Sequence, residues 1–136
     1  MKKRLQRRAN QLQRTLDELI KIRPESFEEY IDLKTKAACE RYVERIAEDI
    51  VSILLLILRN RKIREEPEDD DDIFELVKKE QILPMHLADK LRELKGMRNI
   101  IAHEYGEVDD KRVFDAIEYE IEGDVEEFVS KIKLHL

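Results

Sequence analysis

The sequence contains few residues that interrupt regular structure. Among its 136 residues there are three Gly, three Pro, one Cys and no Trp. It also lacks runs of alternating β-branched residues, which are the pattern that predicts strands. Chains with so few Gly and Pro can form long uninterrupted elements. We therefore expect an all-α fold built from a few long helices.

The single cysteine, Cys39, excludes an intrachain disulfide. Its place in an Ala-rich helical stretch predicts a small buried side chain rather than a nucleophile. The longest apolar run, residues 50–58, is far shorter than the ~20 residues that span a bilayer. No signal-type apolar region follows the basic start. We expect a cytoplasmic protein that neither enters a membrane nor is exported.

Charged residues make up 43% of the chain and hydrophobic residues 42%, a balance typical of amphipathic helices with charged outer faces. The net charge of −6 argues against a surface built throughout to hold nucleic acid. The charge is unevenly distributed, because residues 2–23 contain eight Lys or Arg and only two Asp or Glu. One end of the molecule should therefore be basic. The length fits a single domain over residues 1–136.

Apolar spacing and capping signals predict an antiparallel bundle of four to five helices. Ser26 with Glu29 has the form of a capping box, Asp32 is a second cap, and Pro84 suits a first helical position. The expected helices run from about residue 2 to 22, from between 27 and 34 to about 59, over 73–80, from 84 to about 94, and from 109 or 110 to about 133.

The segment from Val51 to Leu58 is apolar on nearly all sides. Such a helix must be covered all round, and one short domain has few layers with which to cover it. This favours a homodimer interface at the segment. The alternative is a central core helix of a monomeric bundle.

Four adjacent carboxylates, Asp69 to Asp72, end an irregular acidic stretch. Hard cations need ligands spaced so that they converge, which favours a solvated run ending in a helix N-cap over a metal site.

The stretch "GMRNIIAHEYGEVDD", residues 96–110, combines apolar residues with Arg98, Asn99, His103 and Tyr105. In a regular helix Arg98 and His103 would lie about 140° apart around the axis and about 7.5 Å apart along it. They would not share one face. Either the helix breaks, for which Gly96 and Gly106 are available, or each side chain meets partners from elsewhere, such as a second subunit.

This stretch resembles the signature of the HepT-like toxins of the HEPN superfamily, a Gly-x-Arg-Asn-x-x-x-His-x-Tyr string near the C-terminus. Five residues match in type and spacing, namely Gly96, Arg98, Asn99, His103 and Tyr105. The order of the predicted helices also resembles that family. Glu48, on the long predicted helix, resembles an acidic residue that the family often places near its site.

The resemblance implies a homodimeric, metal-independent endoribonuclease without cofactor, the toxin of a type VII-like toxin–antitoxin system. His103 would be the general base at a ribose 2′-hydroxyl, and Arg98 would bind the phosphate; a neutral imidazole and a guanidinium suit these tasks. Asn99 and Glu48 would support them. The cleft would contain residues from both chains.

The resemblance also implies a minimal nucleotidyltransferase as antitoxin, which transfers AMP to the tyrosine matched by Tyr105. The basic N-terminal helix and the acidic Asp69 to Asp72 run are candidate docking surfaces for this partner.

Two alternatives remain open at the level of sequence. Arg98, Asn99 and His103 could only cap the end of their helix and satisfy its free carbonyls. The chain could also be a non-catalytic helical module that dimerises and binds a nucleotidyltransferase, which the acidic net charge favours.

Overall fold

The computed structural model describes residues 2–63, 67–103 and 108–135. Within these ranges the chain is helical and contains no strand. The helices are α1 (Lys2–Ile22), α2 (Phe27–Tyr30), α3 (Leu33–Asn60), α4 (Asp70–Lys79), α5 (Met85–His103), α6 (Asp110–Tyr119), α7 (Ile121–Ile132) and a final 3₁₀ turn, η1 (Lys133–His135).

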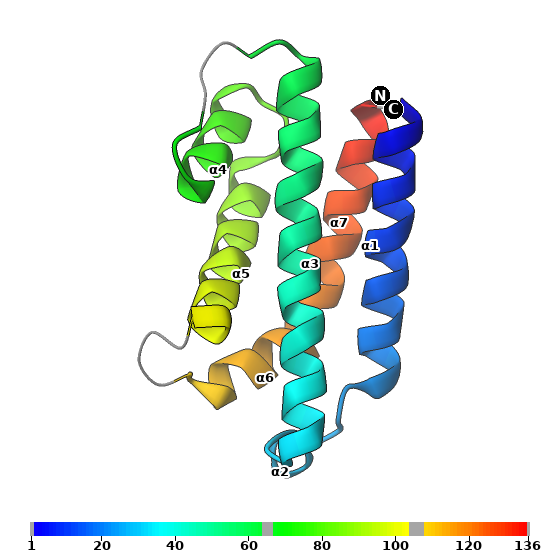
Figure 1. Ribbon diagram of the computed structural model, residues 1–136, viewed down its shortest axis with the longest axis vertical. Coiled ribbons are helices and arrows are strands. Elements are labelled where there is room, and N and C mark those ends of the chain that lie inside the picture. The colour runs from blue at the N-terminus through cyan, green and yellow to red at the C-terminus, as the bar shows by residue number, and fades with distance from the viewer. Residues whose placement is uncertain (1, 64–66, 104–107, 136) are drawn as a thin grey trace.

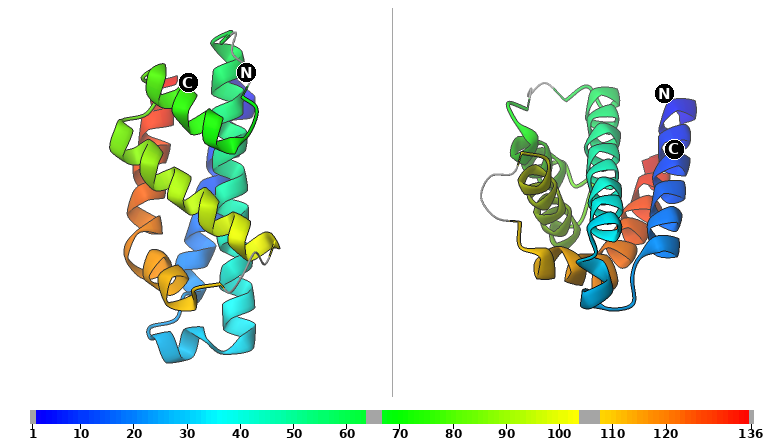
Figure 2. Two further views of the ribbon diagram at one scale, coloured as in Figure 1. Left: turned by 90° about the vertical axis from the view of Figure 1, so that its left-hand side faces the viewer. Right: turned by 60° about the horizontal axis from the view of Figure 1, so that its bottom comes forward.

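The long helices α1, α3, α5 and α7 form an antiparallel bundle with α3 at its centre (Figure 1). The short helices α2 and α6 close one end, and α4 packs beside α5 toward the other end (Figures 1 and 2). Both termini lie at the end of the bundle where α3 finishes (Figure 1). The predicted all-α bundle is confirmed. The short helix α2 and the division of the C-terminal helix into α6 and α7 bring the number of α-helices among the described residues above the four to five expected.

Side-chain caps begin several helices where the sequence predicts them. Ser26 Oγ accepts from the backbone N–H of Glu29 at 3.2 Å, and Asp32 accepts from that of Thr35 at 3.2 Å. Asp69 likewise caps α4. Because Asp69 provides this cap, α4 begins at Asp70, earlier than the predicted start at 73.

The prediction that the helix after Pro84 ends near Leu94 is wrong. α5 continues through Gly96 to His103 without a break. An added Cβ at Gly96 would meet no atom within 4 Å, so this glycine marks neither a turn nor a close approach within the chain. Tertiary packing of α5 against α3 outweighs the weak helix propensity of one glycine.

The predicted single C-terminal helix is divided in two. It begins at Asp110 as expected, capped by Asp109, but Glu120 leaves the helical conformation with φ −123° and ψ −49°. The Glu120 carboxylate accepts from Arg112 at 2.6 Å. The apolar residues Ile117 and Ile121 keep helical spacing across this bend, so periodicity alone could not reveal it.

The apolar half of α3 lies mainly in the core of the chain itself. Ile53, Leu54 and Ile57 are fully buried, and α1, α4 and α5 pack around the helix. The expectation that one domain has too few layers to cover this segment is therefore wrong for most of its residues. Val51 and Leu55 remain partly exposed.

Cys39 is buried, as predicted, and this burial raises the pKa of its thiol to about 11. A thiol with such a pKa stays protonated and unreactive near neutral pH. No helix in the described part of the chain is long and apolar enough to cross a bilayer.

Candidate active site

Arg98 lies on α5 and points toward α3, the helix packed against it. Its Nη2 donates to Glu48 Oε1 at 3.0 Å. The Arg98 side chain is 19% exposed and that of Glu48 is 44% exposed, so the pair sits at the edge of the bundle rather than inside it. The resemblance implied that Glu48 lies near the candidate site, and this contact brings it to Arg98.

Asn99 and the buried Lys95 extend this cluster along α5. Asn99 Oδ1 accepts from Lys95 Nζ at 3.1 Å and from Arg98 Nη1 at 3.2 Å. Lys95 Nζ also pairs with Asp70 at 2.8 Å. Because two cations hold its carbonyl oxygen, the amide of Asn99 has one preferred orientation.

Sequence reasoning missed Lys95 and Asp70. Lys95 is only 7% exposed and stands one turn after the buried Leu91, so a cation within an apolar stripe was the readable signal. Asp70 was interpreted as part of a solvated acidic run. Its neighbours do serve that simpler role, since Asp69 caps α4 and Asp72 accepts from the backbone N–H of Glu68 at 3.0 Å.

His103 is the last residue of α5 and is exposed. Because the helix continues through both residues, Arg98 and His103 lie on different faces, about 140° apart. His103 lies one turn beyond Asn99, on the same side of α5. Of the predicted site residues, the chain thus gathers Arg98, Asn99 and Glu48 in one cluster. Tyr105 lies outside the described residues, as does Gly106.

If Arg98 and Asn99 served only to cap α5, their side chains would bond to the free backbone carbonyls at its end. Their side chains bond instead to Glu48, to Lys95 and to each other. Within the described residues, neither side chain bonds a backbone carbonyl at the end of α5. A capping role therefore does not account for these two residues.

Asp49, which follows Glu48 on α3, has a carboxylate oxygen, Oδ2, that is buried and has no hydrogen-bond partner among the described residues. Burial raises the pKa of Asp49 and the Glu48 charge adds to the rise, while Arg45 and Arg8 oppose it.

The opposite face of α5 borders a cavity of about 420 Å³ between α5 and α6, lined by Gly96, Met97, Ile100 and Val113 among others. Gly96 lies about 200° around the helix from Arg98. The glycine of the motif thus faces away from the charged cluster.

Comparison with known proteins shows the family to which the chain belongs. A family model described as ribonuclease HepT-like matches residues 12–132. The chain belongs to the HepT-like family. The match contains all the helices from the second half of α1 to α7, together with the motif. It confirms the family expected from the Gly96 to Tyr105 string.

Among relatives of the HepT-like chain is an mRNA nuclease HepT of Shewanella oneidensis, 31% identical over 67 residues. The aligned segment spans 49% of this chain and 50% of that relative.

Solved structures share the HepT-like fold over nearly the whole chain. A tri-AMPylated HEPN toxin of Shewanella oneidensis, solved in complex with an MNT antitoxin, superposes with a TM-score of 0.89 at 22% identity, covering 96% of each chain. The cytosolic protein of unknown function YutE of Bacillus subtilis superposes with a TM-score of 0.82 at 16% identity, covering 99% of this chain and 90% of that one. Because the sequence identities are this low, these superpositions establish the shared fold alone.

Proposed function

We propose that this protein is a metal-independent endoribonuclease, the toxin of a type VII-like toxin–antitoxin pair, with His103 and Arg98 as catalytic residues. The observation that carries the proposal is the Arg98, Asn99 and His103 string, joined to Glu48, in a chain of a family described as ribonuclease. We place the protein in the cytoplasm.

In the proposed reaction, neutral His103 removes the proton from a ribose 2′-hydroxyl. The 2′-oxygen attacks the adjacent phosphorus, the bond to the 5′-oxygen breaks, and that oxygen leaves with a proton returned by His103. The products are a 2′,3′-cyclic phosphate and a free 5′-hydroxyl. Arg98 stabilises the negative charge that develops on the phosphate, and Glu48 and Asn99 position its guanidinium.

A substrate with one altered sugar tests this chemistry. Purified protein should cleave an RNA oligonucleotide and leave a 2′,3′-cyclic phosphate. The same oligonucleotide with a 2′-deoxy nucleotide at the scissile position should resist cleavage there, because the nucleophile is missing. Cleavage of the deoxy substrate would exclude the mechanism. Absence of all cleavage, with a nucleotidyltransferase still bound, would favour the non-catalytic module.

The working site is proposed to form between two copies of the chain. On one α5, Arg98 and His103 face different directions, and a two-fold axis beside α5 would bring Arg98 of one protomer toward His103 of its partner. Val51 and Leu55, partly exposed and close to Glu48 along α3, would contribute apolar contact to such a dimer.

Mixing two inactive variants tests the composite site. Arg98→Ala and His103→Ala protomers should each be inactive alone. In a random mixture half of the dimers are mixed, and each mixed dimer has one intact composite site. Activity should therefore return to about one quarter of the wild-type value if independent sites assort randomly. No recovery, with mixed dimers present, would place both residues of a site in one chain.

A minimal nucleotidyltransferase is the proposed antitoxin, with Tyr105 as the residue that receives AMP. The structural relative from Shewanella oneidensis is described as tri-AMPylated and bound to an MNT antitoxin, which supports this assignment. AMP near the cleft would add negative charge and bulk where an RNA phosphate must approach Arg98.

Coexpression with the partner tests this assignment. It should add AMP to the peptide that contains Tyr105, which mass spectrometry detects, and Tyr105→Phe should abolish the addition. A silenced toxin with unmodified Tyr105 would show inhibition by binding alone.

A further inference from the structure

The outer face of α1 has a row of cations that the proposed chemistry does not use. Lys3, Arg7, Arg14 and Lys21 are all exposed. At about 100° per residue they lie within about 40° of one another, and they extend for about 27 Å along the helix. We call these four residues the cationic strip. Leu5, Leu12, Leu16 and Leu19 fill the opposite, buried face of α1.

The strip residues form no ion pair within the described part of the chain. The carboxylates that flank the row are Asp17 and Glu18, between Arg14 and Lys21. Other cations are paired, for example Lys36 with Asp110 at 3.0 Å and Lys111 with Asp115 at 2.8 Å. In a chain of net charge −6, this leaves a local excess of positive charge on one face.

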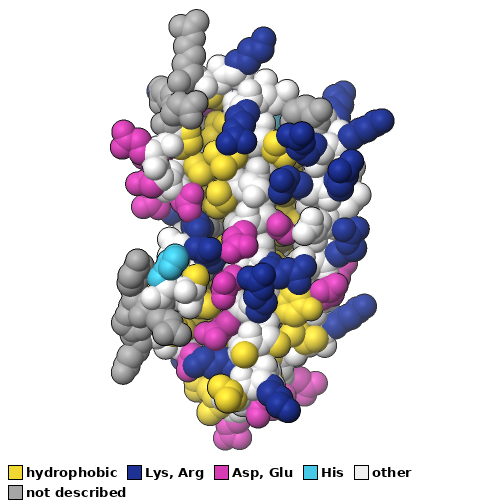
Figure 3. Space-filling model, viewed as in Figure 1, with side chains coloured by type: hydrophobic (Ala, Val, Ile, Leu, Met, Phe, Trp, Pro, Cys, Tyr) yellow, Lys and Arg dark blue, Asp and Glu magenta, His cyan; other side chains and the backbone are white. Residues whose placement is uncertain are grey.

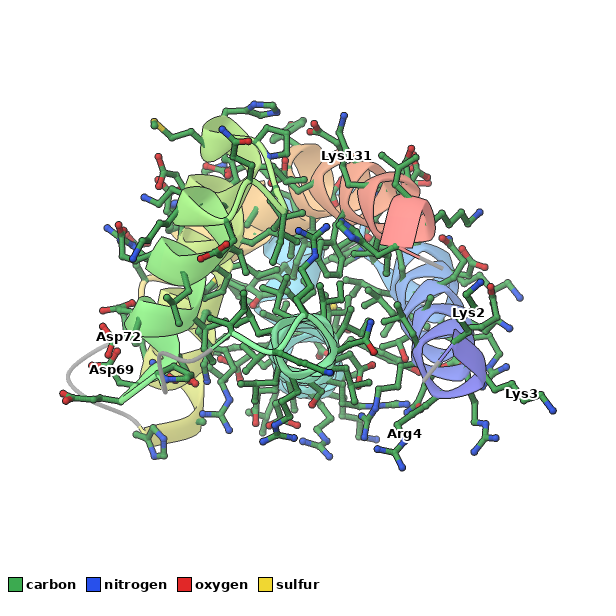
Figure 4. All side chains as sticks on the ribbon, turned by 90° about the horizontal axis from the view of Figure 1, so that it is seen from above. Lys2, Lys3, Arg4, Asp69, Asp72 and Lys131 are labelled. Carbon is green, nitrogen blue, oxygen red and sulfur yellow. The ribbon has the colours of Figure 1, made fainter. Side chains whose placement is uncertain are left out.

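The figures show the same separation of charge. Lys and Arg side chains gather over the side of the molecule where α1 lies (Figure 3). Viewed along the bundle, Lys2 and Lys3 project outward from the start of α1, while Asp69 and Asp72 lie on the far side (Figure 4). A shallow depression beside the first turns is lined by Lys2, Lys3, Gln6, Arg7 and Asn10.

The chemistry of the strip distinguishes between two kinds of partner. Protein interfaces generally have an apolar or aromatic centre. The exposed large hydrophobic side chains of the described residues begin at Ile22, so none lies within the strip. Lys and Arg interspersed with amides such as Gln6 and Asn10 instead suit phosphate and sugar oxygens. The strip thus fits a nucleic-acid backbone better than a protein surface.

The helix that carries the strip packs against α3, which also carries Glu48, the partner of Arg98. Arg8, which acts on Asp49 of α3, lies about 120° around α1 from the centre of the strip and is not part of it. We propose that the cationic strip binds the phosphate backbone of the RNA substrate outside the cleavage site. This inference rests on the proposed ribonuclease function. The expectation that the basic helix docks the antitoxin is the competing assignment, and the test below distinguishes the two.

The test is the salt dependence of RNA binding in a His103→Ala background, which prevents cleavage. A fluorescein-labelled, mixed-sequence single-stranded RNA is titrated by anisotropy at several salt concentrations. The strip variant is Lys3→Gln, Arg7→Gln and Arg14→Gln combined. The control, Lys34→Gln, Lys90→Gln and Lys111→Gln combined, removes the same charge from exposed positions elsewhere. Circular dichroism checks that both remain folded.

We expect the strip variant to bind more weakly and to lose about 2 from the slope of log affinity against log salt, since each single-strand phosphate contact contributes about 0.7. The control should keep its slope. Equal slopes for both variants, with wild-type protein still cleaving RNA, would overturn this inference alone. If the protein with an intact strip does not bind RNA, and wild-type protein does not cleave it, this inference fails together with the proposed function. Loss of nucleotidyltransferase binding in the strip variant, with RNA binding unchanged, would assign the strip to the antitoxin.

Discussion

Arg98 Nη2 on α5 donates to Glu48 Oε1 on α3 at 3.0 Å, and this ion pair joins the signature motif to the central helix of the bundle. Asn99 Oδ1 accepts from a second nitrogen of the same guanidinium at 3.2 Å. A planar fork can satisfy both acceptors together, whereas an ammonium group cannot reproduce that geometry.

Arg98→Lys should therefore keep the charge but lose cleavage, by about 10²- to 10³-fold. The change in the free energy of unfolding should stay below about 1 kcal/mol, because a lysine can still pair with the partly exposed Glu48. Initial cleavage rates and urea unfolding measure the two effects. Arg92→Lys, at an exposed pair with Glu75, is the matched control and should cleave normally. Equal rates for both variants would remove Arg98 from the reaction.

Lys95→Met tests whether the buried lysine positions Asn99. The variant should lose on the order of tenfold in cleavage rate, or ~1.4 kcal/mol of transition-state stabilisation. Its stability should change by less than about 1 kcal/mol, because the methionine fills the space and Asp70, 41% exposed, remains hydrated. Lys78→Met, which breaks the pair with Asp89, is the control and should leave cleavage unchanged. A fall in stability as large as the fall in rate would indicate a structural role.

The sequence predicts the bundle well because its signals are local. Leucine spacing defines α1, and Ser26 and Asp32 mark helix starts because each side chain accepts from a backbone N–H three residues later. The bend at Glu120 was missed because Ile117 and Ile121 keep helical spacing across it, so the apolar period is intact.

The site was predicted only in part, for a related reason. The motif names Arg98 and Asn99, but the contacts of Lys95 with Asp70 and of Arg98 with Glu48 join residues far apart in sequence. Helical periodicity carries no information about such contacts. The coverage of Val51 to Leu58 was misjudged likewise, because α1, α4 and α5 pack around α3 in three dimensions.

Gly96→Ala should raise the free energy of unfolding by about 0.5–1 kcal/mol, since Ala is the better helix former and an added Cβ meets open space. Gly123→Ala, in equally open surroundings on α7, should stabilise similarly. Cleavage should be unchanged in both, because Gly96 lies about 200° around α5 from Arg98 and about 10 Å along the helix from His103. Thermal denaturation and cleavage rates test this. Loss of cleavage by folded Gly96→Ala alone would show that another chain packs closely against that face.

Asp49→Asn should stabilise the protein at neutral pH, by up to about 1 kcal/mol. Burial raises the pKa of Asp49 above its unfolded value, so the folded chain holds that proton more tightly. As pH rises from the ordinary Asp pKa through the raised value, ionised Asp49 increasingly destabilises the fold. The gain from Asn should therefore be present at pH 7 and vanish below about pH 3.9. Urea unfolding at both pH values measures it, and a gain confined to low pH would contradict the assignment.

Cleavage of cellular RNA by purified protein in the presence of a chelator tests the central claim most directly, with His103→Ala compared in parallel. His103 is exposed at the end of α5, so its removal should leave the helical content and thermal transition nearly unchanged. We predict that wild-type protein cleaves without added metal and that His103→Ala, although folded, does not. Cleavage by His103→Ala at the wild-type rate, or cleavage by wild type that stops with the chelator, would contradict the account.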